Sequence, residues 1–196
     1  MIARVRDTVP SERPVSAAIG DLPNLPGTAA LAALGAARSG ATFVKVGLWG
    51  VSTEGDAVLL LRAVREGVAS VPGTAVVAAA YADARRAAAA PLAPELLPRV
   101  ARAAGVGVCL LDTAVKDGSG LLEWLSPDAL AVVVADAHAA GLQVALAGAL
   151  RVEDLPAVRD TGADIAGIRS AACRGGTRSG SLDAARVRAL VAACAA

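Results

Sequence analysis

Short apolar runs alternate along the chain with longer stretches in which Ala, Leu and Arg recur at helical spacing. The short runs are typical of buried β-strands, and the longer stretches are typical of amphipathic helices. We expect strands at Val15–Ile19, Phe43–Gly47, Ala75–Ala80, Gly107–Leu111, Gln143–Ala147 and Asp164–Ile168. We expect helices at Ala29–Ser39, Gly55–Ser70, Leu92–Ala104, Ser126–Ala140 and Val152–Thr161, and a last helix that starts near Ser181.

Regular alternation of apolar strands and helices predicts a parallel sheet covered by helices on both faces. A flavodoxin-like or Rossmann sheet remains an alternative, although the first strand–helix turn has no G-x-G-x-x-G fingerprint. Polar residues follow nearly every strand, and in a barrel those strand ends meet at one rim. We therefore predict an α/β fold of the (β/α)8 TIM-barrel type, as one domain over residues 1–196 with six of the eight βα units.

The length of the chain agrees with that count of units. A typical barrel has about 250 residues, so six eighths of one is roughly 190, and this chain has 196. Residues Met1–Pro10 read as the tail of a helix that leads into the first strand. We expect that the first two βα units are missing, and that the exposed strand edges lead to poor solubility or to pairing with another copy in a homo-oligomer.

Composition and charge exclude several classes of function. The net charge is +1 and the aromatic residues are one Phe, one Tyr and two Trp, so neither an electrostatic nor a stacking surface for nucleic acid is expected. No apolar run is long enough for a membrane span, and the N-terminal stretch MIARVRDTVPSERP has no apolar signal-peptide core. We expect a cytoplasmic protein. Three scattered cysteines and a single histidine, His138, predict neither a disulfide framework nor a metal site.

Lysine is rare in this chain, which has 17 arginines but only Lys45 and Lys116. Lysine can lose its proton or form a Schiff base, and the guanidinium group of arginine does neither. Lys45 lies in the apolar strand Phe43–Gly47, where alternation places it opposite Val44 and Val46. Facing a barrel interior, it would serve as a general base or an amine nucleophile. The alternative is a salt-bridged lysine near the rim.

The second lysine lies in a loop after a predicted strand. Asp112 ends that strand, and Lys116 follows four residues later. The carboxylate could orient the ammonium group or exchange a proton with it. Alternatively, Asp112 only caps the turn.

Glycine-rich turns follow the last two predicted strands. Gly148 ends one strand, Gly167 and Arg169 end the next, and Gly175 and Gly176 follow in the same loop. Backbone N–H groups of the late loops form the usual phosphate site of a barrel. We therefore expect a phosphorylated small molecule as the ligand.

Polar side chains after three other elements are weaker candidates. Asp21 follows the first strand and could bind substrate hydroxyls or hold its own turn. Tyr81 and Asp83 follow the third strand and could offer a phenol and a carboxylate to the rim. His138 lies late in a helix, where a structural role is expected.

Six segments together resemble a known enzyme family. In chain order they are VSAAIGDLPNLPGT, FVKVGLWGV, VVAAAYADARR, LLDTAVKDG, VALAGAL and DIAGIRSAACRGG. The same motifs recur in the (5-formylfuran-3-yl)methyl phosphate synthases, also called 4-(hydroxymethyl)-2-furancarboxaldehyde-phosphate synthases. The resemblance extends from about Val15 to the final helix.

This resemblance implies a lyase that condenses two molecules of glyceraldehyde 3-phosphate into a furan phosphate, with loss of phosphate and water. The product belongs to the biosynthesis of methanofuran, a carrier in C1 metabolism. No metal or organic cofactor is implied. The proton-accepting lysine of the family corresponds to Lys45, and its L-D-T-A-x-K-D-G aspartate and lysine correspond to Asp112 and Lys116.

The chain departs from the family pattern at one point. The Schiff-base lysine of the family lies in a D-V-K-type motif on the second strand, and these 196 residues contain no such segment. A start codon placed too far downstream, a fragment, or a degenerate paralogue would each explain the difference. Two alternatives therefore stay open: a class I aldolase-like enzyme, and a catalytically impaired barrel remnant that binds a sugar phosphate or a partner.

Overall fold

The computed structural model describes residues 1–86 and 92–195 and contains one six-stranded sheet. All five strand pairs are parallel, and the strands follow one another in chain order across the sheet. The strands are β1 (Ser16–Asp21), β2 (Phe43–Gly47), β3 (Ala75–Tyr81), β4 (Val108–Asp112), β5 (Gln143–Ala147) and β6 (Ile165–Gly167). Each of the six predicted strands is present with boundaries close to those expected.

Helices connect these strands in regular alternation. The α-helices are α1 (Ile2–Thr8), α2 (Pro26–Arg38), α3 (Glu54–Val68), α4 (Leu97–Ala104), α5 (Leu121–Trp124), α6 (Pro127–Ala139), α7 (Leu155–Asp160) and α8 (Ala184–Ala195). Short 3-10 turns occupy η1 (Ala84–Arg86), η2 (Pro94–Leu96), η3 (Val152–Asp154), η4 (Ser170–Ala172) and η5 (Arg174–Gly176). No helix in these described ranges is long and apolar enough to cross a membrane.

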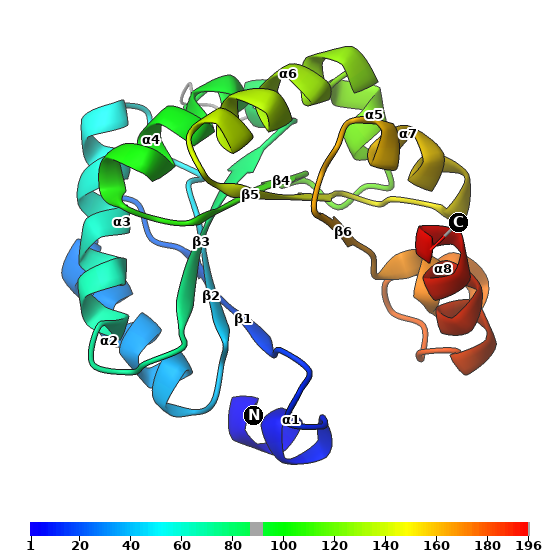
Figure 1. Ribbon diagram of the computed structural model, residues 1–196, viewed down its shortest axis with the longest axis horizontal. Helices are drawn as coiled ribbons and strands as arrows, with labels where there is room; N and C mark the ends of the chain where they lie inside the picture. The colour runs from blue at the N-terminus through cyan, green and yellow to red at the C-terminus, as the bar shows by residue number, and fades with distance from the viewer. Residues whose placement is uncertain (87–91, 196) are drawn as a thin grey trace.

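The sheet has the topology of a barrel and not that of a doubly wound fold. A Rossmann sheet reverses its strand order at a switch point, whereas β1 to β6 are strictly sequential. The sheet curves, and α2, α3, α4 and α6 lie along its outer side (Figure 1). The prediction of a TIM-barrel-type fold with six βα units is confirmed. In the described ranges β1 and β6 are the two edges of the sheet.

Alternating strand residues divide between two apolar layers. On the outer side, Val44, Val46 and Leu111 are fully buried in a cluster that includes the helix residues Ala33 and Leu61. The residues between them on the strands face inward and form a separate cluster.

The inner cluster has as its buried members Val77, Ala79, Val108, Leu110 and Ala145, all of them strand residues. The expectation of helices on both faces is therefore wrong, because the curved sheet covers its inner face with its own side chains.

Three helices begin later than their sequence pattern predicts. One is the helix predicted as Val152–Thr161, in which a 3-10 turn over Val152–Asp154 precedes the α-helix that begins at Leu155. In the stretch predicted as Leu92–Ala104, the α-helix begins only at Leu97, after a 3-10 turn that starts at Pro94. The final helix begins at Ala184 instead of near Ser181. The preceding residues are held in an extended pairing, because Arg174 N donates to Ser181 O and Asp183 N donates to Ala172 O. Asp183 then caps the helix through the amides of its first turn.

Candidate functional site

Lys45 lies on the inner face of the sheet, halfway along β2. Its neighbours Val44 and Val46 point the opposite way and are fully buried beneath the helices. The register pairs Lys45 with Ala18 of β1 and Val77 of β3. A lysine between apolar strands is costly unless its amine reaches a polar space. The Lys45 side chain lines a cavity on this face.

Asp112 and Lys116 form an ion pair at the carboxyl end of β4. Lys116 Nζ lies 3.0 Å from Asp112 Oδ1 and also donates to the carbonyl oxygen of Thr113. The same carboxylate oxygen accepts a hydrogen bond from Thr113 N at 2.8 Å. These bonds fold the long lysine side chain back over the end of the strand.

Lys45, Asp112 and Lys116 share a cavity of about 650 Å³ with the glycine-rich turns. The wall is completed by the loops after β4, β5 and β6. Its other members are Thr113, Val115, Asp117, Gly118, Ser119, Ala147, Gly148, Ala149, Gly167, Ile168, Arg169, Ser170, Gly176, Thr177 and Arg178. The structure therefore brings together seven of the nine predicted site residues, and only Asp21 and Gly175 are outside this wall.

The turns after β5 and β6 depend on glycine at the positions that line the cavity. Gly148 has φ +114°, and a Cβ there would lie 3.1 Å from the backbone nitrogen of Thr113. Gly176 has φ +67°. Glycine adopts such positive φ values without the steric penalty that other residues meet. Gly175 also has a positive φ, but it does not line the cavity.

The charge balance of the cavity favours an anionic ligand. Lys45, Lys116, Arg169 and Arg178 contribute four cations to the wall. The two wall carboxylates, Asp112 and Asp117, are each paired with a cation, Lys116 and Arg86 respectively. The Arg169 guanidinium donates to the carbonyl oxygen of Arg178, which holds the two ends of the loop after β6 together. A net positive wall of this kind attracts a phosphate group.

Asp21 is not part of this wall, because its carboxylate is turned towards Tyr81. Tyr81 Oη donates to Asp21 Oδ1 at 2.7 Å, and the Trp49 amide donates to the same oxygen at 3.1 Å. Burial, followed by the hydrogen bond to Asp21, raises the pKa of the Tyr81 phenol. Gly47 permits this contact, since a Cβ there would lie 1.9 Å from Asp21 Oδ1.

Tyr81 adjoins a second, smaller cavity of about 40 Å³. This cavity also contacts Lys45 and Asp112, so the two cavities share these two side chains. Tyr81 followed the third predicted strand, but its bond to Asp21 depends on the pairing of β1, β2 and β3.

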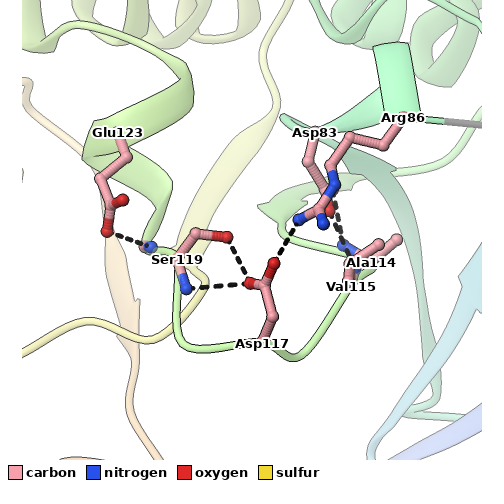
Figure 2. A network of polar contacts seen from close by, with 8 residues as sticks. Asp83, Arg86, Ala114, Val115, Asp117, Ser119 and Glu123 are labelled. Carbon is pink, nitrogen blue, oxygen red and sulfur yellow. Dashed lines mark hydrogen bonds and ion pairs between the residues drawn. The ribbon is translucent and has the colours of Figure 1, made fainter.

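From its position in the sequence, Asp83 is expected to offer a carboxylate to the rim. It does not do so. It is fully buried, and its two oxygens accept hydrogen bonds from Ala114 N at 2.7 Å and Val115 N at 2.9 Å. Figure 2 shows these bonds beside the ion pair between Arg86 and Asp117. Asp83 therefore contacts the backbone of the Lys116 loop.

His138 lies away from the cavity and pairs with Asp164. Its Nε2 is 3.0 Å from Asp164 Oδ2, which also accepts from Val144 N at 2.7 Å. Neither residue lines the cavity. Among the residues that the structure describes, no group of three or more His, Cys, Asp or Glu side chains is arranged to hold a metal ion.

Comparison with known proteins finds similar sequences along nearly the whole chain. The family model described as 4-HFC-P synthase matches residues 1–191. A (5-formylfuran-3-yl)methyl phosphate synthase from Methanocaldococcus jannaschii is 45% identical over 196 residues, covering 99% of this chain and 83% of that protein. The enzyme of the same name from Methanopyrus kandleri is 47% identical over 197 residues, covering 100% of this chain and 82% of that protein.

A solved structure shares the fold at much lower sequence identity. A 3-hexulose-6-phosphate synthase superposes with a TM-score of 0.61 at 21% identity, covering 98% of this chain and 78% of that one. At this level of identity the likeness concerns the fold alone.

Proposed function

The chain belongs to the 4-HFC-P synthase family, and from this premise we propose that it is a lyase that makes (5-formylfuran-3-yl)methyl phosphate. Its substrate would be glyceraldehyde 3-phosphate, of which two molecules condense. The product would enter the biosynthesis of methanofuran. Family membership and the M. jannaschii and M. kandleri relatives support the assignment of the reaction, and the cavity supports the assignment of residues.

The observation that carries the proposal is the shared wall of one cavity. Half-buried Lys45 and the pair of Asp112 and Lys116 lie on one side. The glycine turns, with Arg169 and Arg178, lie on the other. A triose phosphate needs both halves, because its phosphate must be held while the carbon next to its aldehyde loses a proton. A cavity of about 650 Å³ is in the range of small-molecule sites, which are roughly 300–1,000 Å³.

The condensation divides into steps that these residues can serve. Lys45 accepts a proton from the carbon beside the carbonyl group of one triose, and the resulting carbanion forms a C–C bond with the aldehyde of the other. Phosphate then leaves by elimination, and dehydration closes and aromatises the ring. Two trioses thus yield one furan phosphate, one phosphate and two waters, with no net oxidation.

We assign Lys116 the return of protons to departing oxygens, with Asp112 orienting its ammonium group. General acid–base catalysis requires such a group within hydrogen-bond reach of the oxygen that takes the proton. Gly148, Gly167, Arg169 and Gly176 are assigned to the phosphate group. Asp21, turned towards Tyr81, keeps its second carboxylate oxygen for a substrate hydroxyl, and Gly175 supports the turn that contains Gly176.

The test is product formation by the full chain supplied with glyceraldehyde 3-phosphate. A furan aldehyde absorbs in the near ultraviolet, so the product is followed by absorbance and identified by its mass. The Lys45→Arg variant keeps the charge but cannot accept a proton at neutral pH, and it should lose turnover. Arg38→Lys, the reverse exchange at an exposed position of α2, is the matched control and should keep it. Absence of the furan phosphate with the unaltered chain would refute the proposal.

The same preparation tests whether an amine of this chain forms a Schiff base with the substrate. Borohydride reduces a Schiff base to a stable adduct, and peptide mapping then locates it. Because Lys45 and Lys116 are the two lysines of these 196 residues, the map has few possible outcomes. An adduct on Lys45 would contradict its assignment as the proton acceptor and would favour a class I aldolase-like reaction.

A further inference from the structure

The loop that carries Lys116 is held from behind by the loop that follows β3. The Asp83 carboxylate receives hydrogen bonds from the amides of Ala114 and Val115, at 2.7 Å and 2.9 Å. These two amides come directly before Lys116 in the chain. Asp83 itself is completely shielded from solvent and does not line the cavity.

One peptide group connects Asp83 to Lys116. The peptide group between Thr113 and Ala114 is planar, and its N–H and C=O point in opposite directions. Its N–H donates to Asp83, and its C=O accepts a hydrogen bond from Lys116 Nζ. By fixing the N–H, the Asp83 carboxylate therefore also aims the carbonyl oxygen that receives the lysine.

A second anchor from the same segment holds the far end of the loop. Arg86 forms an ion pair of 2.7 Å with Asp117, whose other oxygen accepts from the amide and the hydroxyl of Ser119 (Figure 2). The Arg86 guanidinium also lies 5.4 Å from the centre of the Trp124 ring. These contacts reach solvent, whereas the Asp83 contact is buried. The buried anchor therefore has the greater control over the turn.

We propose that Asp83 is a positioning residue for Lys116: its carboxylate holds the 113–115 turn from which Lys116 reaches Asp112. Both amide donors need an acceptor, and a carboxylate supplies two. An asparagine supplies one acceptor and one NH2 donor, so one amide loses its partner and the 113–114 peptide can rotate. The proposal rests on the proposed function only in treating Lys116 as part of the catalytic machinery.

The rarity of lysine allows a direct test on the Asp83→Asn variant. Reductive methylation with 13C-formaldehyde labels Lys45, Lys116 and the N-terminal amine, and each gives a separate NMR signal. In Asp83→Asn we expect the Lys116 signal to move or broaden while the Lys45 signal keeps its position. The matched control is Asp136→Asn, the same exchange at an exposed position of α6, in which both signals stay.

Kinetics on the unmethylated variants supply the second readout. A displacement of about 1 Å at a catalytic group costs on the order of 100-fold in rate, so kcat of Asp83→Asn should fall by roughly this factor. KM for glyceraldehyde 3-phosphate should stay within about threefold, because the phosphate side of the cavity is built by other loops. If Asp83 had only a structural role, Asp83→Asn would lower the thermal midpoint of unfolding without a selective fall in kcat at nearly constant KM.

The unaltered chain offers a further measurement that does not depend on the folding of any variant. The amide protons of Ala114 and Val115 should exchange slowly, because both are bonded to a buried carboxylate. Fast exchange of both amides, or a Lys116 signal in Asp83→Asn equal to that in Asp136→Asn, would overturn the proposal. If the chain makes no furan phosphate, the proposed function fails, and the NMR comparison still decides whether Asp83 positions Lys116.

Discussion

Lys116 Nζ lies 3.0 Å from Oδ1 of Asp112, the residue that ends the strand from which the Lys116 loop begins. The pair is neither fully buried nor fully exposed, since the side chains retain 38% and 20% of their accessible surface respectively. An ion pair of this kind contributes about 0–1 kcal/mol to stability. Its importance lies in where it holds the amine, at the edge of a cavity that also contains Lys45.

The first prediction concerns this pair. Asp112→Asn keeps the shape of the side chain and an acceptor for Thr113 N, but removes the charge that orients Lys116. We expect kcat to fall by roughly 100-fold or more, which is typical for the loss of a positioned acid–base group. The free energy of unfolding should change by less than about 1 kcal/mol. Steady-state kinetics and urea unfolding measure the two effects separately.

Glu54→Gln is the matched control for Asp112→Asn. Glu54 pairs with Arg99 on the surface, outside the cavity wall, so its loss breaks an ion pair without touching the site. The control should retain wild-type kcat. Equal kcat for the unaltered chain and Asp112→Asn would exclude a catalytic role for the pair.

The second prediction concerns Gly47, at the carboxyl end of β2. A methyl group there would lie 1.9 Å from Asp21 Oδ1 and 2.3 Å from Tyr81 Oη, so Gly47→Ala must separate these two side chains. We expect a loss of about 1–3 kcal/mol in stability, as for other overpacked sites. The near-ultraviolet circular dichroism should change too, because Trp49 and Tyr81 form an edge-to-face pair with ring centres 5.6 Å apart. An unchanged spectrum and midpoint would show that Asp21 and Tyr81 are not in contact.

The third prediction compares two helical glycines with opposite expected effects. Gly35 in α2 has open space where a Cβ would be, whereas a Cβ at Gly67 in α3 would lie 2.5 Å from the carbonyl oxygen of Ala30. Gly35→Ala should stabilise the protein by about 0.5–1 kcal/mol, because alanine loses less backbone entropy on folding. Gly67→Ala should destabilise it by about 1–3 kcal/mol, because α2 and α3 must move apart. Thermal unfolding of both variants measures the two effects. A shift of the midpoint in the same direction in both variants would contradict the close approach of α2 and α3.

The strands were predictable because each is a short apolar run with clear boundaries. The pattern Phe43–Gly47 coincides with β2, and Gln143–Ala147 coincides with β5. In a parallel sheet with one face under helices and the other facing a filled interior, both faces select apolar residues. Helix starts were less predictable. Pro94 is compatible with the apolar period of Leu92–Ala104, yet the chain forms a 3-10 turn there before α4 begins.

Within the candidate site, the sequence indicated the residues that violate a local pattern. Lys45 interrupts an apolar strand, and Lys116 is one of two lysines in an arginine-rich chain. Nothing local indicated that Asp21 would accept a bond from Tyr81, 60 positions away, or that Asp83 would bind amides 31 and 32 positions away. Those contacts depend on strand register and loop conformation, which the pattern of residue types does not contain.

The fourth prediction concerns the three cysteines. Cys109 has no exposed surface, and burial raises the pKa of its thiol to about 12. Cys173 is also buried, whereas Cys194 is exposed. Because the thiolate is the reactive form, a thiol reagent should modify one cysteine per native chain, Cys194, and all three after unfolding in guanidinium. Cys194→Ser should abolish the reaction of the native chain with the reagent. Modification of Cys109 in the native chain would contradict its burial in the core.

The last prediction concerns acid stability and the Asp164 carboxylate. The hydrogen bond from the Val144 amide, followed by that from His138, lowers the pKa of Asp164 in the folded protein. In the unfolded chain the pKa of an aspartate is about 3.9. A carboxyl with a depressed folded pKa stabilises the protein above its unfolded pKa, and this contribution disappears as the pH falls through the folded value. We therefore expect the free energy of unfolding to decline steadily below about pH 4.

Asp164→Asn isolates this contribution, because the amide oxygen still accepts the Val144 bond but cannot ionise. The variant should be less stable than the unaltered chain near neutral pH, and the difference should shrink as both are acidified. Urea unfolding at a series of pH values from about 6 to about 3 measures both curves. Asp160→Asn, at an exposed carboxylate in α7, is the control and should follow the unaltered chain. Parallel curves for Asp164→Asn and the unaltered chain would show that another carboxylate causes the acid sensitivity. Asp183 would then be the next residue to substitute, because the hydrogen bond from the Arg186 amide lowers its pKa too.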